Sequence, residues 1–367
     1  MTVYVPEEFT DAESDILRRY FSNLDQPVFA LVNLPEVVKG ALFARYSRSP
    51  RSLRRLFLDE FVGDLDIAGD QSVDATIGLE RAEELYEKVF FEYGDDSVAQ
   101  LGGVHLACEQ ASNILTKILE WGRLASYLEQ STRYIAYDAR LAGRYRFYRD
   151  PEVLTSRFGT RYVGDLDRMF DSYSVLMEKV TEHIRATVKR DPADSDFVFR
   201  MATRAKALDA VRGVLPAASL SNVGIYGSGQ SYEAMLIRMR AHPLPEARQY
   251  ADLMLEELRK VIPSFLRRVD LADRGGRWSD YLSDNRENTQ EVVRGLFDET
   301  PVDHSAAVVL TDFDPEGEDK LIAAICYSHT SLPETQIMQR VQRLSHDEKV
   351  SILKSYIGER ENRRHRP

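Results

Sequence analysis

Ionic and hydroxyl side chains are crowded into one stretch, EWGRLASYLEQSTRY, which covers residues 120–134. Within it, Glu129, Ser131 and Arg133 lie inside five consecutive residues. An arginine fork beside a serine hydroxyl and backbone N–H groups is the chemistry that holds a phosphate or the edge of a pyrimidine. The alternative is structural: a helix end tied by ion pairs from Glu129 to Arg133 or Arg123. The residue types alone favour this structural alternative.

Other familiar catalytic patterns do not occur in the sequence. There is no GxxxxGK[ST] phosphate loop, no HExxH and no GxSxG, and GIYGSGQ orders its glycines differently from a dinucleotide fingerprint. The seven histidines are scattered, and the two cysteines, Cys108 and Cys326, have no metal-ligand spacing. We therefore predict that the chain binds no metal.

Composition and charge narrow the class of partner. The 367 residues carry a formal net charge of −11, which disfavours non-specific binding to nucleic acid or to an anionic membrane. No apolar run approaches the roughly 20 residues that span a bilayer. The acidic start, MTVYVPEEFTDAESD, lacks the apolar stretch of a signal peptide, and the low cysteine content fits a reducing compartment. We expect a cytoplasmic protein in which local arginines can still hold a small anion.

The elements that must position the crowded stretch follow from hydrophobic periodicity. Residues 28–33 form a short apolar run and are predicted as a strand, and Pro35 opens a predicted helix. Apolar residues at helical spacing over 104–118 predict a buried helix of about twenty residues leading into the stretch. The glycine-rich segment 213–231 is interpreted as a loop or helix start that another group approaches closely. Further helical patterns cover 164–190, 192–212, 232–240 and 245–268, and DRGGRWSD near Gly275 is a predicted boundary.

Two distant segments resemble each other. Residues 28–48 and 307–329 both present an apolar strand, a proline turn, an apolar helix and then Tyr-Ser. We therefore expect one unit over 1–290 and the beginning of a second, truncated repeat over 300–367. Chance similarity between two strand–helix units is the alternative.

Several ordered motifs resemble the flavin-dependent thymidylate synthase family. SYLEQSTRY (126–134) resembles its Ser-x-Asn-Glu-x-Ser-x-Arg-Tyr signature, which follows an Arg-His-Arg run, and VRGVLP (211–216) resembles its Ala-Arg-x-x-Leu-Pro element. GSGQSYEAMLIRMR (227–240) falls where the family carries Asn-Ala-Arg-Ser-Leu, and PEARQYADLM resembles its last core helix. The resemblance implies an α+β fold, with a central sheet flanked by long helices, that assembles as a homo-oligomer.

The resemblance also implies roles for individual residues. Glu129, Ser131 and Arg133 match positions that hold dUMP, and Arg212 matches an arginine that also contacts the nucleotide. Arg123 and Gln230 fall at cofactor positions, and no catalytic residue is assigned. The implied reaction methylates dUMP to dTMP with methylenetetrahydrofolate, FAD and NADPH, and the reduced flavin supplies the hydride.

The departures from the family pattern lie on the flavin side. Trp121 and Gly122 replace the first arginine and the histidine of Arg-His-Arg, and Asp95 and Asp96 replace a histidine-containing approach to the flavin. Two functions therefore stay open: an active methyltransferase of this type, or a degenerate nucleotide-binding or assembly unit that lacks flavin on its own. We expect residues 1–367 to hold no flavin, whereas a longer chain with the whole second repeat would bind it.

Overall fold

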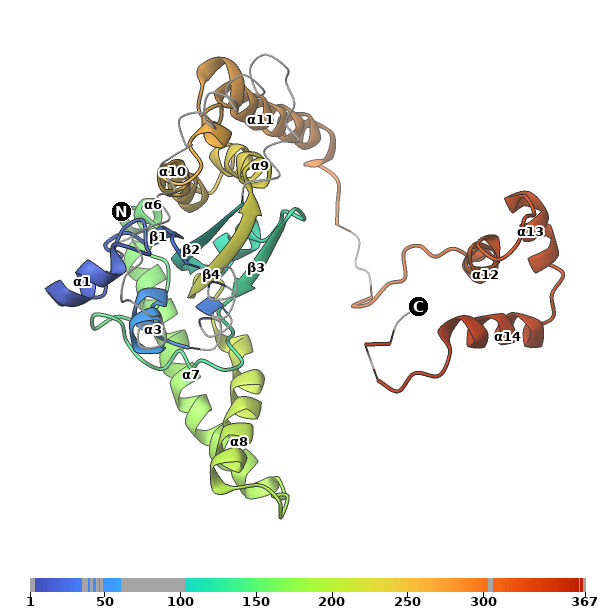
Figure 1. Cartoon of the computed structure of the whole chain (residues 1–367), viewed down its shortest axis with the longest axis horizontal. Helices are drawn as coiled ribbons and strands as arrows, with labels where there is room; N and C mark the ends of the chain where they lie inside the picture. The colour runs from blue at the N-terminus through green and yellow to red at the C-terminus, as the bar shows by residue number, and fades with distance from the viewer. Residues whose placement is uncertain are drawn as a thin grey trace. The chain divides into compact units, whose positions relative to one another are not determined.

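The protein divides into two compact units, Met1–Gly295 and Leu296–Pro367. The computed structural model describes residues 4–34, 49–60, 103–302 and 306–362, together with Lys39, Leu42, Phe43, Tyr46, Arg364 and His365. The helix expected from Pro35 lies mostly outside the described residues, and Asp95 and Asp96 lie wholly outside them. The two units are described separately below (Figure 1).

A four-stranded antiparallel sheet forms the centre of the first unit. Its strands are β1 (Val28–Leu31), β2 (Gly103–Ser112), β3 (Ala125–Glu129) and β4 (Leu220–Ser228), in the spatial order β1-β2-β4-β3. The helices around it are α1 (Asp11–Leu17), α3 (Leu53–Glu60), α5 (Asn113–Leu119), α6 (Pro151–Thr155), α7 (Gly159–Thr187), α8 (Asp196–Val211), α9 (Gly229–Arg240), α10 (Pro245–Arg259) and α11 (Arg277–Phe297). The α+β class and the strand expected near residue 28 are both confirmed (Figure 1).

Both faces of β1 are buried. Val28 and Ala30 belong to a core shared with α5, α9 and α10, whereas Phe29 and Leu31 belong to a second core with α1 and α3. Successive side chains of a strand point to opposite faces, so a strand covered on both sides carries an unbroken apolar run. This explains why β1 was recognisable from its composition.

The long helix expected over 104–118 is wrong. Residues Gly103–Ser112 form β2, and only Asn113–Leu119 are helical. Because β2 is buried along almost its whole length, its apolar residues do not alternate, and some of them fall at helical spacing by coincidence.

The segment 213–231 was expected to be a loop or a helix start. Most of it forms β4, which pairs with both β2 and β3, but α9 does begin within it, at Gly229. The close approach expected there is confirmed. A Cβ added to Gly224 would lie 2.9 Å from the ring of Phe43, and one added to Gly229 would lie 2.7 Å from the Cβ atom of Phe265.

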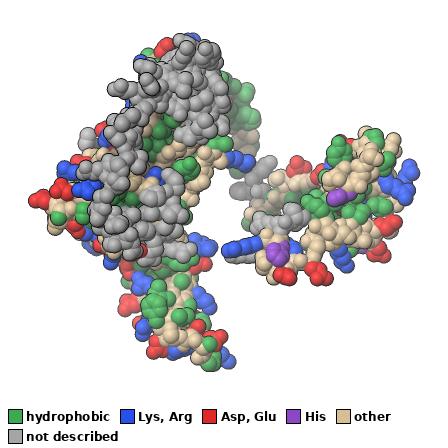
Figure 2. Space-filling view, viewed as in Figure 1, with side chains coloured by type: hydrophobic (Ala, Val, Ile, Leu, Met, Phe, Trp, Pro, Cys, Tyr) green, Lys and Arg blue, Asp and Glu red, His purple; other side chains and the backbone are tan. Residues whose placement is uncertain are grey.

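Helices α7 and α8 pack along each other and extend away from the sheet (Figure 1). They confirm the helical patterns expected over 164–190 and 192–212, and α9 and α10 confirm the two that follow. Buried aromatic residues, among them Tyr137, Phe147, Phe170 and Tyr173, join their base to the sheet. The pair also leaves Val175, Leu176, Phe197 and Met201 exposed, and Figure 2 shows hydrophobic side chains on its surface.

Gly275 lies in a tight π-helical turn, Ala272–Gly276, that leads straight into α11, and the two compact units divide later, after Gly295. A Cβ added to Gly275 would lie 2.2 Å from the carbonyl oxygen of Val269, which makes the position specific to glycine.

The second unit contains α12 (Gly317–Tyr327), α13 (Glu334–Val341) and α14 (His346–Ile357), packed around Ile322, Ala323, Ile337 and Val341. The helix expected in the second repeat is confirmed, but the strand expected before it is wrong. Residues 306–314 are irregular, and Val308 is 89% exposed. In the first unit β1 is stabilised by pairing with β2, and the described part of the second unit has no strand to play that role.

Candidate functional site

The chain leaves β3 at Glu129 and immediately turns. The amides of Tyr134 and Ile135 donate to the carbonyl oxygen of Ser131 at 3.1 and 3.2 Å, and the amide of Arg133 donates to Ser131 Oγ at 3.3 Å. The amides of Ser131 and Thr132 meet no acceptor among the described residues. The crowded stretch is therefore a strand followed by a serine-anchored turn, and the expected helix end is wrong.

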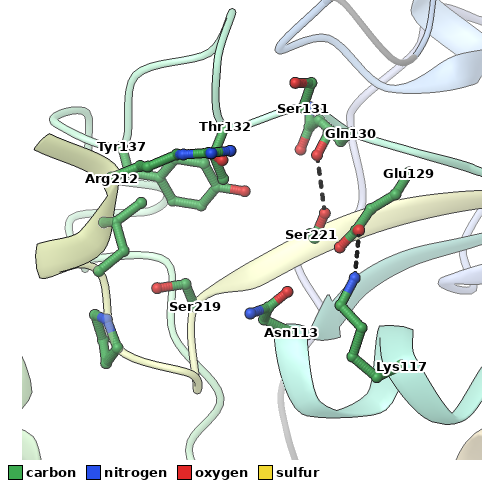
Figure 3. A pocket seen from close by; sticks show the side chains of 12 residues that line it. Asn113, Lys117, Glu129, Gln130, Ser131, Thr132, Tyr137, Arg212, Ser219 and Ser221 are labelled. Carbon is green, nitrogen blue, oxygen red and sulfur yellow. Dashed lines mark hydrogen bonds and ion pairs between the residues drawn. The ribbon is translucent and has the colours of Figure 1, made fainter. Parts of the chain in front are cut away.

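A pocket of about 380 Å³ opens beside this turn. The turn, α5 and the segment from Arg212 to Ser221 enclose it (Figure 3). Its lining residues are Asn113, Lys117, Glu129, Gln130, Ser131, Thr132, Tyr137, Arg212, Leu215, Pro216, Ser219 and Ser221. The structure thus brings together Glu129, Ser131 and Arg212, which were predicted from distant parts of the sequence.

Two arginines share one carboxylate at one side of the pocket. The Nε atoms of Arg133 and Arg212 each lie 3.1 Å from Oδ1 of Asp209, in the last turn of α8. Arg133 does not line the pocket itself, but Asp209 holds it next to Arg212, which does. All three side chains are more than one-third exposed, so these pairs contribute little to stability and mainly orient the guanidinium groups.

A lysine and two glutamates form the opposite side. Lys117 Nζ lies 2.7 Å from Glu129 Oε2 and 3.3 Å from Glu120 Oε2. Partial burial lowers the pKa of Lys117, but the hydrogen bond and charge of Glu129 outweigh it, so the pKa is raised overall. Asn113 lies four residues before Lys117, so both side chains point from the same face of α5 into the pocket. The partner of Glu129 is therefore Lys117, and not Arg123 or Arg133.

The buried carboxylate of Glu246 is hydrogen-bonded to the residue that caps the start of α5. Ser112 caps the helix by accepting from the amide of Leu115 at 3.0 Å. Its own amide and hydroxyl donate to Glu246 at 2.8 and 2.5 Å. Glu246 is 1% exposed, and burial raises its pKa to about 7 although the bonds from Ser112 act in the opposite direction. Glu246 thus positions the helix that carries Asn113 and Lys117.

The two residues predicted at cofactor positions lie elsewhere. Arg123 precedes β3, and Gln230 begins α9 just after β4. In the ladder between these strands, Ala125 pairs with Gly227, whereas Glu129 pairs with Val223. At a rise of about 3.3 Å per residue, the two ends of β3 are about 13 Å apart. The structure therefore separates Arg123 and Gln230 from the pocket.

The corner around Gly122 is filled by neighbouring side chains. A Cβ added there would lie 2.8 Å from the hydroxyl of Tyr127 and 3.5 Å from Nη2 of Arg238. Trp121 is 71% exposed, and the guanidinium of Arg238 lies 5.0 Å from the centre of its ring. Arg123 makes no ion pair with any described residue. The described corner therefore contains an exposed indole and two guanidinium groups, those of Arg123 and Arg238.

Sequence reasoning missed the lining residues Asn113, Lys117 and Ser219, and also Asp209, which pairs with the two arginines. Two signals were present: the Asn113–Lys117 spacing of four, and the Asp209–Arg212 spacing of three. Ser219 was hidden because β4 was interpreted as a loop.

Two further findings concern the described residues as a whole. None of their histidine, cysteine, aspartate and glutamate side chains gather in threes that suit a metal ion. No helix among them has both the length and the apolar character needed to cross a membrane.

Comparisons with known proteins give one family and several long relatives. A sequence model of the family described as thymidylate synthase complementing protein matches residues 46–264. A UPF0159 protein of Chlamydia pneumoniae is 38% identical over 368 residues, covering 98% of this chain and 68% of the relative. A UPF0159 protein of Chlamydia muridarum is 36% identical over 98% of this chain and 69% of its own length. One of Thermoplasma acidophilum is 28% identical over 89% of this chain and 66% of its own length.

Proposed function

The chain belongs to the thymidylate synthase complementing protein family, and from this premise we propose that the pocket beside Arg212 binds dUMP. The observation that supports this most directly is the shared carboxylate, because Asp209 gathers two guanidinium groups beside a pocket of about 380 Å³. A pocket of this size suits a small ligand such as a mononucleotide.

The phosphate belongs at the arginine side. Arg212 and Arg133 supply charge-assisted donors, and the Ser131 hydroxyl and the amides of Ser131 and Thr132 supply neutral ones. Glu129 lies across the pocket as an acceptor for the N–H and O–H groups of the nucleoside. Lys117 offsets its negative charge, which would otherwise repel the phosphate.

The family's function is of the flavin-dependent thymidylate synthase type, in which bound flavin supplies the hydride for making dTMP from dUMP. For this chain we propose a cytoplasmic methyltransferase unit that uses methylenetetrahydrofolate and NADPH once flavin contacts are completed by another copy of the chain. The exposed apolar side chains of α7 and α8 favour such a homo-oligomer. The second candidate, a non-catalytic nucleotide-binding unit, is favoured by the filled corner at Gly122.

Calorimetric titration with dUMP tests the nucleotide site. Arg212→Ala and Arg133→Ala should each remove a charge-assisted bond of about 1.5–3 kcal/mol and weaken binding roughly 10- to 150-fold. Arg190→Ala is the matched control, because Arg190 also pairs with an exposed aspartate, Asp196, at the start of α8. Equal affinities in all four proteins, or no heat with any of them, would remove the nucleotide proposal.

Purified protein also distinguishes the two candidate functions. A flavin absorbance band that survives desalting, together with turnover of dUMP in the presence of methylenetetrahydrofolate and NADPH, identifies the enzyme. A colourless and inactive protein that still binds dUMP identifies the nucleotide-binding unit.

A further inference from the structure

Two buried serines line the pocket, and they differ in whether the side-chain hydroxyl has a hydrogen-bond partner. Ser219 is 5% exposed and Ser221 is 4% exposed, and both line the same cavity. The hydroxyl of Ser221 donates to the carbonyl oxygen of Gln130 at 3.5 Å. The hydroxyl of Ser219 has no hydrogen-bond partner among the described residues. A buried hydroxyl without a partner is rare in native proteins and costs stability, so it calls for an explanation.

The hydroxyl is the one polar group of Ser219 without a hydrogen-bond partner among the described residues. The amide of Ser219 donates to the carbonyl oxygen of Pro216 at 2.9 Å, and its carbonyl oxygen accepts from the amide of Asn113 at 2.9 Å. These bonds place Ser219 directly beside Asn113, another lining residue. The amide nitrogen of the Asn113 side chain donates to no described residue.

The position of this pair shows which part of a ligand it meets. In Figure 3, Ser219 lies between Arg212 and Asn113 along the edge of the pocket, away from Ser131 and the turn. The charged and backbone donors that suit a phosphate lie at the turn and at Arg212. A hydroxyl and a carboxamide are uncharged, and each can both donate and accept, so they suit sugar hydroxyls or the edge of a base.

We propose that Ser219 and Asn113 recognise the uncharged nucleoside part of the ligand and thereby set the preference for a nucleotide over a simple phosphate. This assignment rests on the proposed dUMP site. The hydroxyl of Ser219 can reach a bound ligand by rotating about χ1 between staggered positions, without any movement of the backbone.

The test compares Ser219→Ala, Asn113→Ala, Ser221→Ala and Arg212→Ala, titrated with dUMP and with inorganic phosphate. Ser219→Ala and Asn113→Ala should each weaken dUMP binding about 2- to 10-fold, the worth of one neutral hydrogen bond, and leave phosphate affinity unchanged. Arg212→Ala should weaken both ligands. Ser219→Ala should not lower the melting temperature, because it deletes a group without a partner, whereas Ser221→Ala should lower it.

Four results would overturn the assignment. Ser219→Ala could leave dUMP affinity unchanged, or it could lower the melting temperature and the affinity for both ligands together, which marks a structural role. If the wild-type protein binds phosphate as tightly as dUMP, the assignment is also overturned, although the pocket is still an anion site. A wild-type protein that binds neither removes the proposed function as well. If Ser219→Ala does not fold, Ser219→Cys keeps the shape with a weaker donor and takes its place in every comparison.

Discussion

Strand β3 joins two regions of very different character. At its C-terminal end, Glu129 and the turn after it lead into a pocket where every ionic group has a partner of opposite charge. At its N-terminal end, Trp121 and Leu124 are 71% and 70% exposed, and Arg123 has no ionic partner among the described residues. One end gathers paired ionic groups around a pocket, and the other presents apolar surface.

The difference shows that the two ends of a single strand can differ in charge pairing and exposure while they share one sheet. The pocket end depends on the pairing of Lys117 with Glu129 and of Asp209 with two arginines, and α5 and α8 are each anchored in a hydrophobic core. The corner at Gly122 depends on a few loop residues, so substitutions there leave the sheet intact. Four variants test this difference between the two ends of β3.

The largest effect is expected from the buried carboxylate under α5. The pKa of Glu246 is raised by burial from 4.5 to about 7, so the folded protein keeps this proton to higher pH than the unfolded chain does. The free energy of unfolding should therefore fall by roughly 3 kcal/mol as the pH rises from about 4.5 to about 7. Glu246→Gln should remove this dependence in denaturant titrations at both pH values.

Glu257→Gln is the control for that experiment. Glu257 is also buried on α10, at 3% exposure, but it pairs with Lys260 at 2.5 Å. Replacing this second buried carboxylate of the same helix shows whether a change in the pH dependence is specific to Glu246. If the free energy of unfolding of Glu246→Gln still falls with pH as in the wild type, another group must titrate over this range.

The next effect is expected at the corner. Gly122→His, which restores the family residue, should destabilise the protein by about 1–3 kcal/mol, because its Cβ meets the hydroxyl of Tyr127. Adding Tyr127→Phe should recover part of this loss, since it removes the contacting oxygen. Thermal unfolding of both variants measures the difference. An equally stable Gly122→His protein would show that the corner can still accommodate a histidine.

A smaller effect is expected from the charge balance of the pocket. Lys117→Met leaves Glu129 facing the ligand without its cation, which should weaken dUMP binding about fivefold while changing stability by less than about 1 kcal/mol. Adding Glu129→Gln should restore the affinity if repulsion is the cause. Persistent weak binding in the double variant would show that Lys117 contacts the ligand directly.

The smallest effect is expected at Arg123. This side chain is exposed and unpaired, so Arg123→Ala should change stability by no more than about 0.5 kcal/mol and leave dUMP affinity unchanged. Calorimetry beside Arg212→Ala makes the comparison direct. A large loss of dUMP binding would place the nucleotide at both ends of β3 and end the contrast.

Sequence reasoning correctly predicted the elements whose apolar residues recur at a clear spacing. Helices α7 to α10 have one apolar face each, and β1 is short and bounded by turn residues. Strands β2 and β4 were missed because burial on both faces removes the alternation, and because Gly224 and Gly227 weaken the strand signal of β4.

The residues of the site likewise divide into those that the sequence revealed and those that it did not. Glu129, Ser131, Arg133 and Arg212 belong to motifs that can be compared with a family, and the structure places three of them in one pocket. Asp209, Glu246 and Ser219 act through contacts with residues far away in the chain or through burial. Only the i,i+3 spacing of Asp209 and Arg212 is visible in the sequence, so the folded chain was needed to reveal the roles of Glu246 and Ser219.

The absence of any linker between β2 and α5 has a consequence for how fast a ligand can bind. Ser112 ends the strand and Asn113 begins the helix, and their amides are bonded to Glu246 and to Ser219. Amides held in this way exchange their hydrogen with solvent only when the surrounding structure opens. Slow exchange at these two positions would mean that the pocket floor has its final shape before the ligand arrives, so that diffusion and orientation, rather than rearrangement, set the association rate.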